Sequence, residues 1–224
     1  MAIGELEAGN TKYTRGAGSM ELCQGVADYL SKHHEIKVSA EDIVVTPGAK
    51  QAMLYSFLVT TMPGDEVILL APSWASYEPM LEFIGAKPVH VPVRKDNFHP
   101  DLDAIREAVT DRTRMILLNS PCNPTGAVFT PEEIQGILQI AVDNDLWIVS
   151  DEIYSRMVWV DWPHVSPASL PGGIERTIVV NGWSKSWAMT GMRLGFLTGP
   201  PNAVKAAIKS QANSASHVPT FMME

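Results

Sequence analysis

Two kinds of segment alternate along the chain, and the spacing of their hydrophobic residues tells them apart. Short runs of β-branched and aliphatic residues, which predict strands, occupy residues 42–46, 66–71, 88–93, 115–120, 146–151 and 177–182. Between them, apolar residues recur at helical spacing over residues 49–62, 76–84, 102–109 and 130–143. The run EVILLA at 66–71 is almost wholly apolar, which is typical of a strand covered on both faces.

This order of elements predicts the class of fold. Buried strands separated by helices form largely parallel sheets with helices on both faces. We therefore expect an α/β fold, a three-layer α/β/α arrangement around a mostly parallel sheet, in one domain over residues 1–224. The helix at 130–143 has a clear start, because Thr130 is followed by Pro131 and by two carboxylates. Residues 1–9 read as the last turns of a further helix.

The amino-acid composition and charge exclude several classes of protein. Hydrophobic residues make up 46% of the 224 residues and charged residues 19%, which indicates an ordinary globular protein. The net charge of −8 favours neither nucleic acid nor an anionic membrane as partner. Cys23 and Cys122 are too few for a disulfide scaffold. No signal peptide and no apolar run of about 18 residues is present, so we expect a soluble, cytoplasmic protein.

Polar residues follow the strand runs, at the edge of the sheet where active sites of α/β folds gather. The strand at 42–46 leads into Pro47-Gly48-Ala49-Lys50, a turn whose backbone N–H groups can hold a phosphate at a helix start. The strand at 115–120 leads into PCNPTG, which presents Asn123. Each of these segments alone is equally well explained as a plain turn.

Two further strands end in residues whose side chains can bind a ligand or react with one. Asp151 closes the run LWIVSD, with Tyr154 three residues on. A carboxylate there needs a cationic partner, either a protonated pyridine nitrogen or an ordinary salt bridge or helix cap. The run TIVVNG leads to Lys185, an amine that partial desolvation would make a competent imine-forming nucleophile. Arg193 is suited to bidentate binding of phosphate.

Taken together, these segments are recognisable. The blocks, in chain order from Lys12 to about Pro200, are TKYTRGAG, VVTPGAKQA, APSWASYEP, NSPCNPTG, SDEIY and NGWSKSWAMTGMRLGF. The chain resembles the class I/II aminotransferases of pyridoxal-phosphate (PLP) fold type I, in the bacterial aspartate-aminotransferase-like branch. The resemblance implies an incomplete PLP-binding large domain, with an N-terminal arm and a C-terminal small domain expected outside residues 1–224.

The resemblance also implies roles for single residues around the cofactor ring. Lys185 matches the lysine that forms the Schiff base with PLP and moves protons. Asp151 matches the partner of the pyridine nitrogen. Tyr154 and Asn123 match groups that hydrogen-bond the phenolic oxygen of the ring. Trp74 matches the aromatic residue that stacks on the ring, and Trp74 and Asn123 also match substrate-binding positions.

Phosphate binding maps onto a second set, namely Gly48, Ala49, Lys50, Ser184 and Arg193. Ser184 carries this role weakly, because many relatives place the serine where this chain has Gly182. Tyr13 matches a tyrosine that reaches the phosphate of a partner subunit, which implies a homodimer. Cys122 and Met192 depart from the asparagine and tryptophan that are common at these positions.

The leading hypothesis is transamination between an L-amino acid and a 2-oxo acid with PLP as cofactor, without a metal, nucleic acid or membrane. A PLP-dependent lyase of the same fold and a non-catalytic PLP-binding module remain alternatives. The sequence does not identify the amino donor, because the residues that read substrate side chains in this family lie largely in the arm and small domain. A chain of this extent can therefore be inactive by itself.

Overall fold

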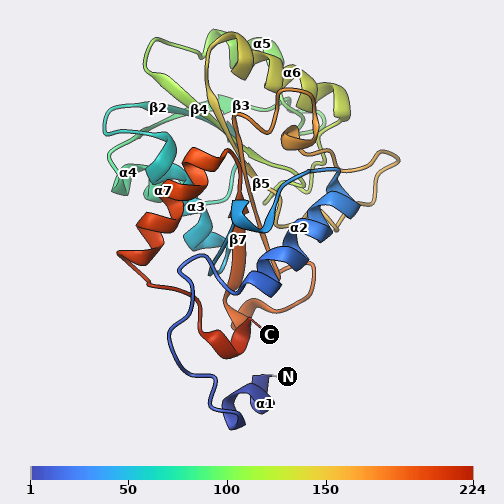
Figure 1. Ribbon diagram of the computed structural model, residues 1–224. Helices are drawn as coiled ribbons and strands as arrows, with labels where there is room; N and C mark the ends of the chain where they lie inside the picture. Colours follow the sequence, from blue (N-terminus) through green and yellow to red (C-terminus); the bar gives the residue numbers. More distant parts are fainter. Residues whose placement is uncertain (1, 224) are drawn as a thin grey trace.

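One mixed sheet of seven strands organises the chain in the computed structural model, which describes residues 2–223 (Figure 1). The strands are β1 Ile43–Pro47, β2 Glu66–Ala71, β3 Lys87–Pro92, β4 Thr113–Asn119, β5 Trp147–Asp151, β6 Thr177–Gly182 and β7 Leu194–Thr198. Their order across the sheet is β1-β7-β6-β5-β4-β2-β3. Strands β3, β2, β4, β5 and β6 are parallel, whereas β7 is antiparallel to both of its neighbours.

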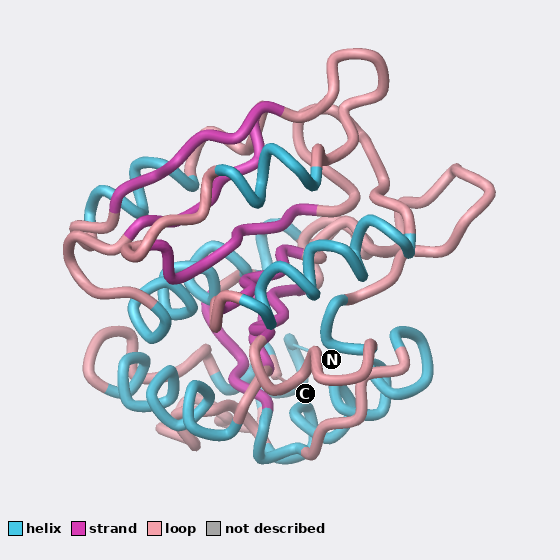
Figure 2. Tube along the Cα trace, turned by 90° about the horizontal axis from the view of Figure 1, so that it is seen from above, coloured by secondary structure: helices cyan, strands magenta, loops and turns pink. Residues whose placement is uncertain are grey.

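Helices cover both faces of this sheet, so the predicted three-layer α/β/α fold is confirmed (Figure 2). The helices are α1 Ala2–Glu7, α2 Met20–His34, α3 Ala49–Thr60, α4 Tyr77–Phe83, α5 Leu102–Glu107, α6 Pro131–Asp143 and α7 Pro201–Ala212. Single 3₁₀ turns occupy Ala40–Asp42, Pro167–Ser169, Thr190–Met192 and Thr220–Met222. Helices α3, α4 and α7 pack on one face, and α2, α5 and α6 on the other.

The strands are apolar because helices cover both faces of the sheet. In β2, Val67 and Leu69 pack in the core beneath α3 and α4, while Ile68 and Leu70 pack beneath α5 and α6. All four side chains are at most 6% exposed. Burying one such side chain contributes about 1.5–3 kcal/mol, so each strand is stabilised from both faces.

The local signals at the start of α6 are confirmed by its capping. Thr130 Oγ1 accepts a 3.2 Å hydrogen bond from the backbone N–H of Glu133, whose side chain accepts one from the Thr130 N–H at 2.9 Å. This reciprocal box satisfies two N–H groups that the helix itself cannot. Elsewhere the helix and strand ends agree with the sequence-based bounds to within two residues, a common uncertainty.

Strand β7 is absent from the sequence-based prediction, and it determines where the site forms. It lies between β6 and β1 and is antiparallel to both, so β1 and β6 run in the same direction. Their carboxyl ends therefore meet at the edge where β4 and β5 also end. Close contact explains Gly195 in this strand, because a Cβ there would collide with the backbone of Gly48 and Ala49.

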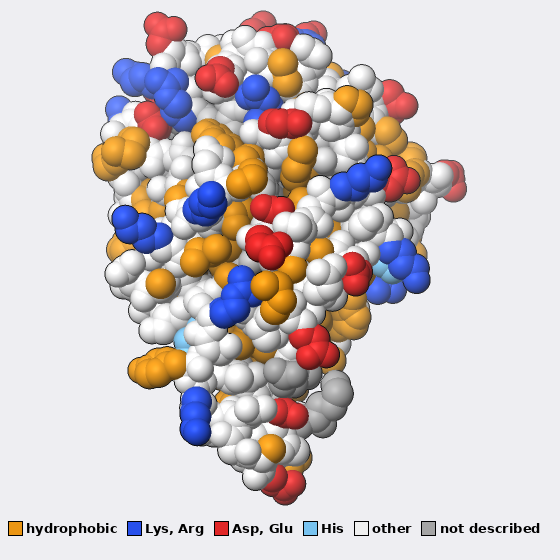
Figure 3. All heavy atoms as spheres, viewed as in Figure 1, with side chains coloured by type: hydrophobic (Ala, Val, Ile, Leu, Met, Phe, Trp, Pro, Cys, Tyr) orange, Lys and Arg blue, Asp and Glu red, His pale blue; other side chains and the backbone are white. Residues whose placement is uncertain are grey.

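Surface properties agree with a globular domain. In the face shown by Figure 3, acidic and basic side chains are interspersed, with no large area of one sign. Within residues 2–223, no helix is long and apolar enough to cross a membrane.

Candidate active site

A cavity of about 260 Å³ opens at the carboxyl ends of β1, β4, β5 and β6. Nine of the eleven residues singled out from the sequence line it, namely Ala49, Lys50, Trp74, Asn123, Asp151, Tyr154, Ser184, Lys185 and Arg193. Gly48 is next to Ala49 and close enough to Arg193 that a Cβ at this position would contact its guanidinium. Tyr13 lies elsewhere: it is 90% exposed and makes an edge contact with His217.

Asp151 forms one pole of the cavity and is only 5% exposed. Its Oδ2 accepts a 2.6 Å hydrogen bond from the Tyr77 hydroxyl, and its Oδ1 accepts one of 3.2 Å from the Ile153 N–H. Burial raises the pKa of Asp151 to about 6, although both hydrogen bonds act in the opposite direction. A buried carboxylate that is costly to ionise is stabilised by any cation placed against it.

Two residues that support this pole escaped the sequence analysis. Tyr77 is 1% exposed, and burial next to Asp151 raises its pKa well above the ordinary value, so it stays a hydrogen-bond donor. Asn119 donates to the Asp151 carbonyl at 3.0 Å and accepts from the Asn123 N–H at 2.8 Å. The i, i+3 spacing of Trp74 and Tyr77 and the polar end of the β4 run were the available signals.

The opposite pole is built for an anion at the start of α3. The first-turn N–H groups of Ala49 and Lys50 have no acceptor within the helix. Arg193 lies beside them and is held by hydrogen bonds to the carbonyls of Thr190, at 2.8 Å, and Pro47, at 3.3 Å. Gly48 has φ +86°, and a Cβ there would push into the Arg193 guanidinium. The turn therefore requires glycine.

The side chain of Lys50 points away from that pole. Its Nζ donates to Ser76 Oγ at 3.2 Å and lies 4.8 Å from the centre of the Trp74 ring. Only the backbone of Lys50 is thus placed to contact a phosphate at the helix start. Its ammonium instead orients Trp74, whose ring meets Tyr77 edge-on at 5.2 Å.

Lys185 lies between the two poles, just beyond β6. Its side chain is exposed, with Nζ 5.8 Å from the centre of the Tyr154 ring. The expected desolvation of this amine by the strand is therefore not present in the chain alone. Ser184, next to it, is 9% exposed and lines the cavity.

The arrangement defines the kind of molecule that fits. A carboxylate at one end suits a cationic ring nitrogen, and the α3 start with Arg193 at the other end suits a phosphate. The Trp74 indole offers a wall for a planar ring, and Lys185 offers a primary amine. These residues fit PLP in the type of contact that each can make.

Comparisons with known proteins agree with this site. The family model for aminotransferase class I and II matches residues 5–224. An aspartate aminotransferase from Musicola paradisiaca is 40% identical over 99% of this chain and 56% of its own length. A probable aspartate/prephenate aminotransferase from Thermus aquaticus is 42% identical over 96% of this chain and 55% of its own length. The chain thus spans little more than half the length of these relatives.

Solved structures give the same result. The aspartate aminotransferase from Thermus thermophilus with maleate superposes with a TM-score of 0.95 at 38% identity, covering 99% of this chain and 58% of that one. The aromatic aminotransferase from Pyrococcus horikoshii superposes at 0.96 and 40% identity, covering 99% and 60%. The chain belongs to the class I and II aminotransferases, a family whose members depend on pyridoxal phosphate.

Proposed function

We propose that this chain binds PLP and serves transamination between an L-amino acid and a 2-oxo acid. The observation that carries this proposal is the pair of opposite poles in one cavity. Buried Asp151 lies at one end, Arg193 and the start of α3 lie at the other, and Lys185 stands between them. A simple phosphate site would not require the buried carboxylate, and an ion pair would not require the phosphate pole.

Each pole has a defined task in this proposal. When bound, PLP supplies an electron sink for negative charge that develops on the substrate Cα. Asp151, held by Tyr77 and the Ile153 N–H, would keep a proton on the ring nitrogen. The adjacent positive charge would in turn favour the ionised carboxylate and lower the pKa of Asp151 from about 6.

We assign the proton transfer to Lys185, in the middle of the cavity. With PLP bound, Lys185 would supply the amine that holds the cofactor covalently and would act as the base and acid in the proton transfer. Its exposure leaves the amine free to move between these two tasks. Tyr154, Asn123 and Trp74 line the same cavity. Tyr154 and Asn123 would hydrogen-bond the ring oxygen of bound PLP, and Trp74 would stack on its ring. Ser184 adds a hydroxyl for the phosphate.

The remaining parts of the proposal concern extent and assembly. We take residues 1–224 as an incomplete large domain, so groups beyond it bind the substrate α-carboxylate. Tyr13 is 90% exposed, as a residue that reaches the phosphate of a second subunit would be, which supports a homodimer. We take this homodimer to be cytoplasmic. Relatives are named for aspartate, prephenate and aromatic substrates, so amino donors of both classes belong in the assay.

Borohydride reduction tests the proposal directly. The protein is incubated with PLP, reduced and mapped by peptide mass spectrometry. We expect a pyridoxyl group on Lys185, lost in Lys185→Ala but kept in Lys205→Ala, which removes an exposed lysine on α7. Scattered labelling of surface lysines in place of Lys185 would contradict the assignment. A lyase is distinguished by product analysis, since it releases a group that transamination does not.

A further inference from the structure

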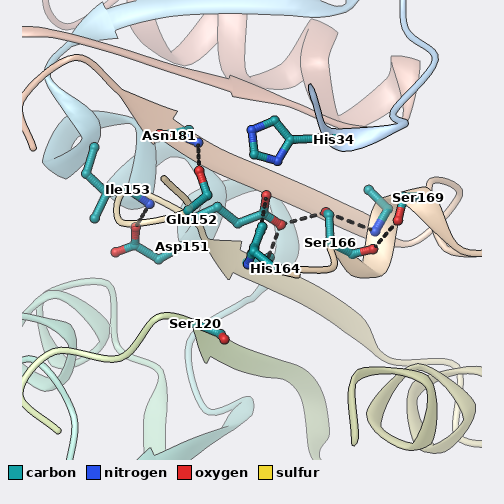
Figure 4. Close-up of polar contacts among 12 residues, drawn as sticks. His34, Ser120, Asp151, Glu152, Ile153, His164, Ser166, Ser169 and Asn181 are labelled. Atoms are coloured by element: carbon teal, nitrogen blue, oxygen red, sulfur yellow. Dashed lines mark hydrogen bonds and ion pairs between the residues drawn. The ribbon is translucent and has the colours of Figure 1, made fainter. Parts of the chain in front are cut away.

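A second group of ionisable side chains lies behind Asp151, outside the cavity lining. It consists of Glu152 at the end of β5, His164 in the following loop and His34 at the end of α2, and we refer to it as the His-Glu-His cluster. Figure 4 shows the Glu152 carboxylate next to His164, with the ring of His34 nearby. The Glu152 side chain is fully buried and that of His164 is 5% exposed.

The carboxylate of Glu152 is satisfied on one oxygen only. Oε1 accepts hydrogen bonds from Ser150 Oγ at 2.9 Å and from Ser166 Oγ at 2.6 Å. Among the described residues, Oε2 has no hydrogen-bond partner, and neither ring nitrogen of His164 has one. Buried polar atoms without partners are rare in folded proteins, so three of them in one cluster require an explanation, of which a bound ion is one.

The contact between Glu152 and His164 has the distance of an ion pair without the direction of a hydrogen bond. Glu152 Oε2 lies 3.2 Å from His164 Nε2, yet the N–H direction does not meet the oxygen. Two donors on one tetrahedral Zn²⁺, with bonds of about 2.0–2.2 Å, are separated by about 3.3–3.5 Å. The observed separation is close to that of two ligands of a common ion.

His34 brings a third potential donor close to this pair. One atom from each of the three side chains lies within 4.8 Å of the others. The Tyr29 hydroxyl contacts His34 Nε2 at 3.1 Å, which orients the ring and leaves Nδ1 available as a ligand. The hydroxyls of Ser150 and Ser166 orient the Glu152 carboxylate in the same way.

A direct ion pair between Glu152 and His164 is the competing explanation for their 3.2 Å contact. It involves two of the three side chains and leaves His34 outside the pair, whereas a shared cation accounts for all three.

We propose that His34, Glu152 and His164 bind one divalent first-row cation, Zn²⁺ by the donor set, with water completing the coordination. Two imidazoles and one carboxylate are a common ligand combination for this ion. The ion would connect the end of α2, the end of β5 and the loop before the 3₁₀ turn Pro167–Ser169. It would therefore be structural and would brace the strand end that carries Asp151.

Zn²⁺ titration of chelator-stripped, folded protein tests this site. We expect one Zn²⁺ per chain by calorimetry, a higher melting temperature with Zn²⁺, and the visible absorption of four-coordinate Co²⁺ after substitution. His34→Ala and His164→Ala should each weaken binding by roughly 100-fold or more, since each removes a ligand. His90→Ala is the matched control, because this imidazole is 44% exposed and pairs with Glu78 at the surface.

Each outcome decides the question. Absence of stoichiometric binding to the wild type, binding that survives both cluster variants, or equal loss in His90→Ala would overturn the proposal in favour of a plain ion pair. If His164→Ala fails to fold, the effect of losing a ligand on Zn²⁺ binding can still be measured in His34→Ala, at the end of α2. Binding should be unchanged in Lys185→Ala, so failure of the metal site and failure of the proposed PLP function are separable.

Discussion

The Tyr77 hydroxyl donates a 2.6 Å hydrogen bond to Oδ2 of Asp151, across 74 residues of sequence. Both side chains are buried, one at the first residue of α4 and the other at the last residue of β5. The bond fixes the direction in which the carboxylate presents its oxygens to the cavity. We therefore propose that Tyr77 is a positioning residue, which would act on bound PLP through Asp151.

Tyr77→Phe should weaken PLP binding while preserving the packing of the ring. Loss of a hydrogen bond to a charged group costs about 1.5–3 kcal/mol, which corresponds to roughly 10- to 150-fold in affinity. Absorbance titration with PLP measures the change. Tyr55→Phe is the control, because it removes a comparable 2.7 Å bond to Ser214 far from the cavity. Equal affinity in the two variants would contradict the positioning role.

Asp151→Asn should stabilise the cofactor-free protein at neutral pH and still impair PLP binding. The pKa of Asp151 is raised from 3.8 to about 6, so its contribution to stability is present below pH 4 and lost as pH rises through 6. Two pKa units correspond to about 3 kcal/mol, an upper estimate for the gain in the variant. Urea unfolding at pH 4.5 and 7.5, with chelator present, gives the comparison. The raised pKa would be refuted if the difference in unfolding free energy between wild type and variant were the same at pH 4.5 and pH 7.5.

Gly48→Ala should reduce PLP affinity more than pyridoxal affinity. The new methyl group displaces the Arg193 guanidinium, and φ is +86° at this position. Backbone strain of this kind costs about 1–3 kcal/mol. Gly64→Ala isolates the strain, because φ there is +94° and no atom lies within 4 Å of the added Cβ. Identical PLP binding in both variants would show that Arg193 is not the phosphate ligand.

Arg193→Met should lower PLP affinity far more than Lys50→Met. The Arg193 guanidinium lies at the start of α3, whereas the Lys50 ammonium is bound to Ser76 and lies over Trp74. A charge-assisted contact to phosphate is worth about 1.5–3 kcal/mol, and only Arg193 is placed to make one. Competition with inorganic phosphate measures both variants. The reverse order of effects would assign the phosphate to Lys50.

Much of this architecture is readable from the chain alone. The strand runs are apolar because both faces of the sheet are covered, and that pattern was sufficient to predict β1 to β6 and the three layers. The site blocks follow strand ends because parallel strands deliver their carboxyl ends to one edge. Nine of the eleven candidate residues therefore line one cavity.

The helices α2 and α7 and the strand β7 are absent from the sequence-based prediction, and of these β7 depends on the tertiary structure. The segment LGFLT of β7 is short and follows directly on a glycine-containing motif, and only pairing with β6 and β1 makes it a strand. Its antiparallel direction then places the Gly48 turn beside Arg193. Local propensity contains no information on such a pairing partner.

Tyr77, Asn119 and the His-Glu-His cluster were likewise decided by the fold. Each depends on side chains that are far apart in sequence, such as His34 and Glu152, and no spacing rule connects them. The sequence determined which residue types stand at the strand ends and hence the chemistry available there. The tertiary structure decided burial and partners, because the desolvation and hydrogen bonding that shift a pKa or orient a ligand come from neighbours that only packing supplies.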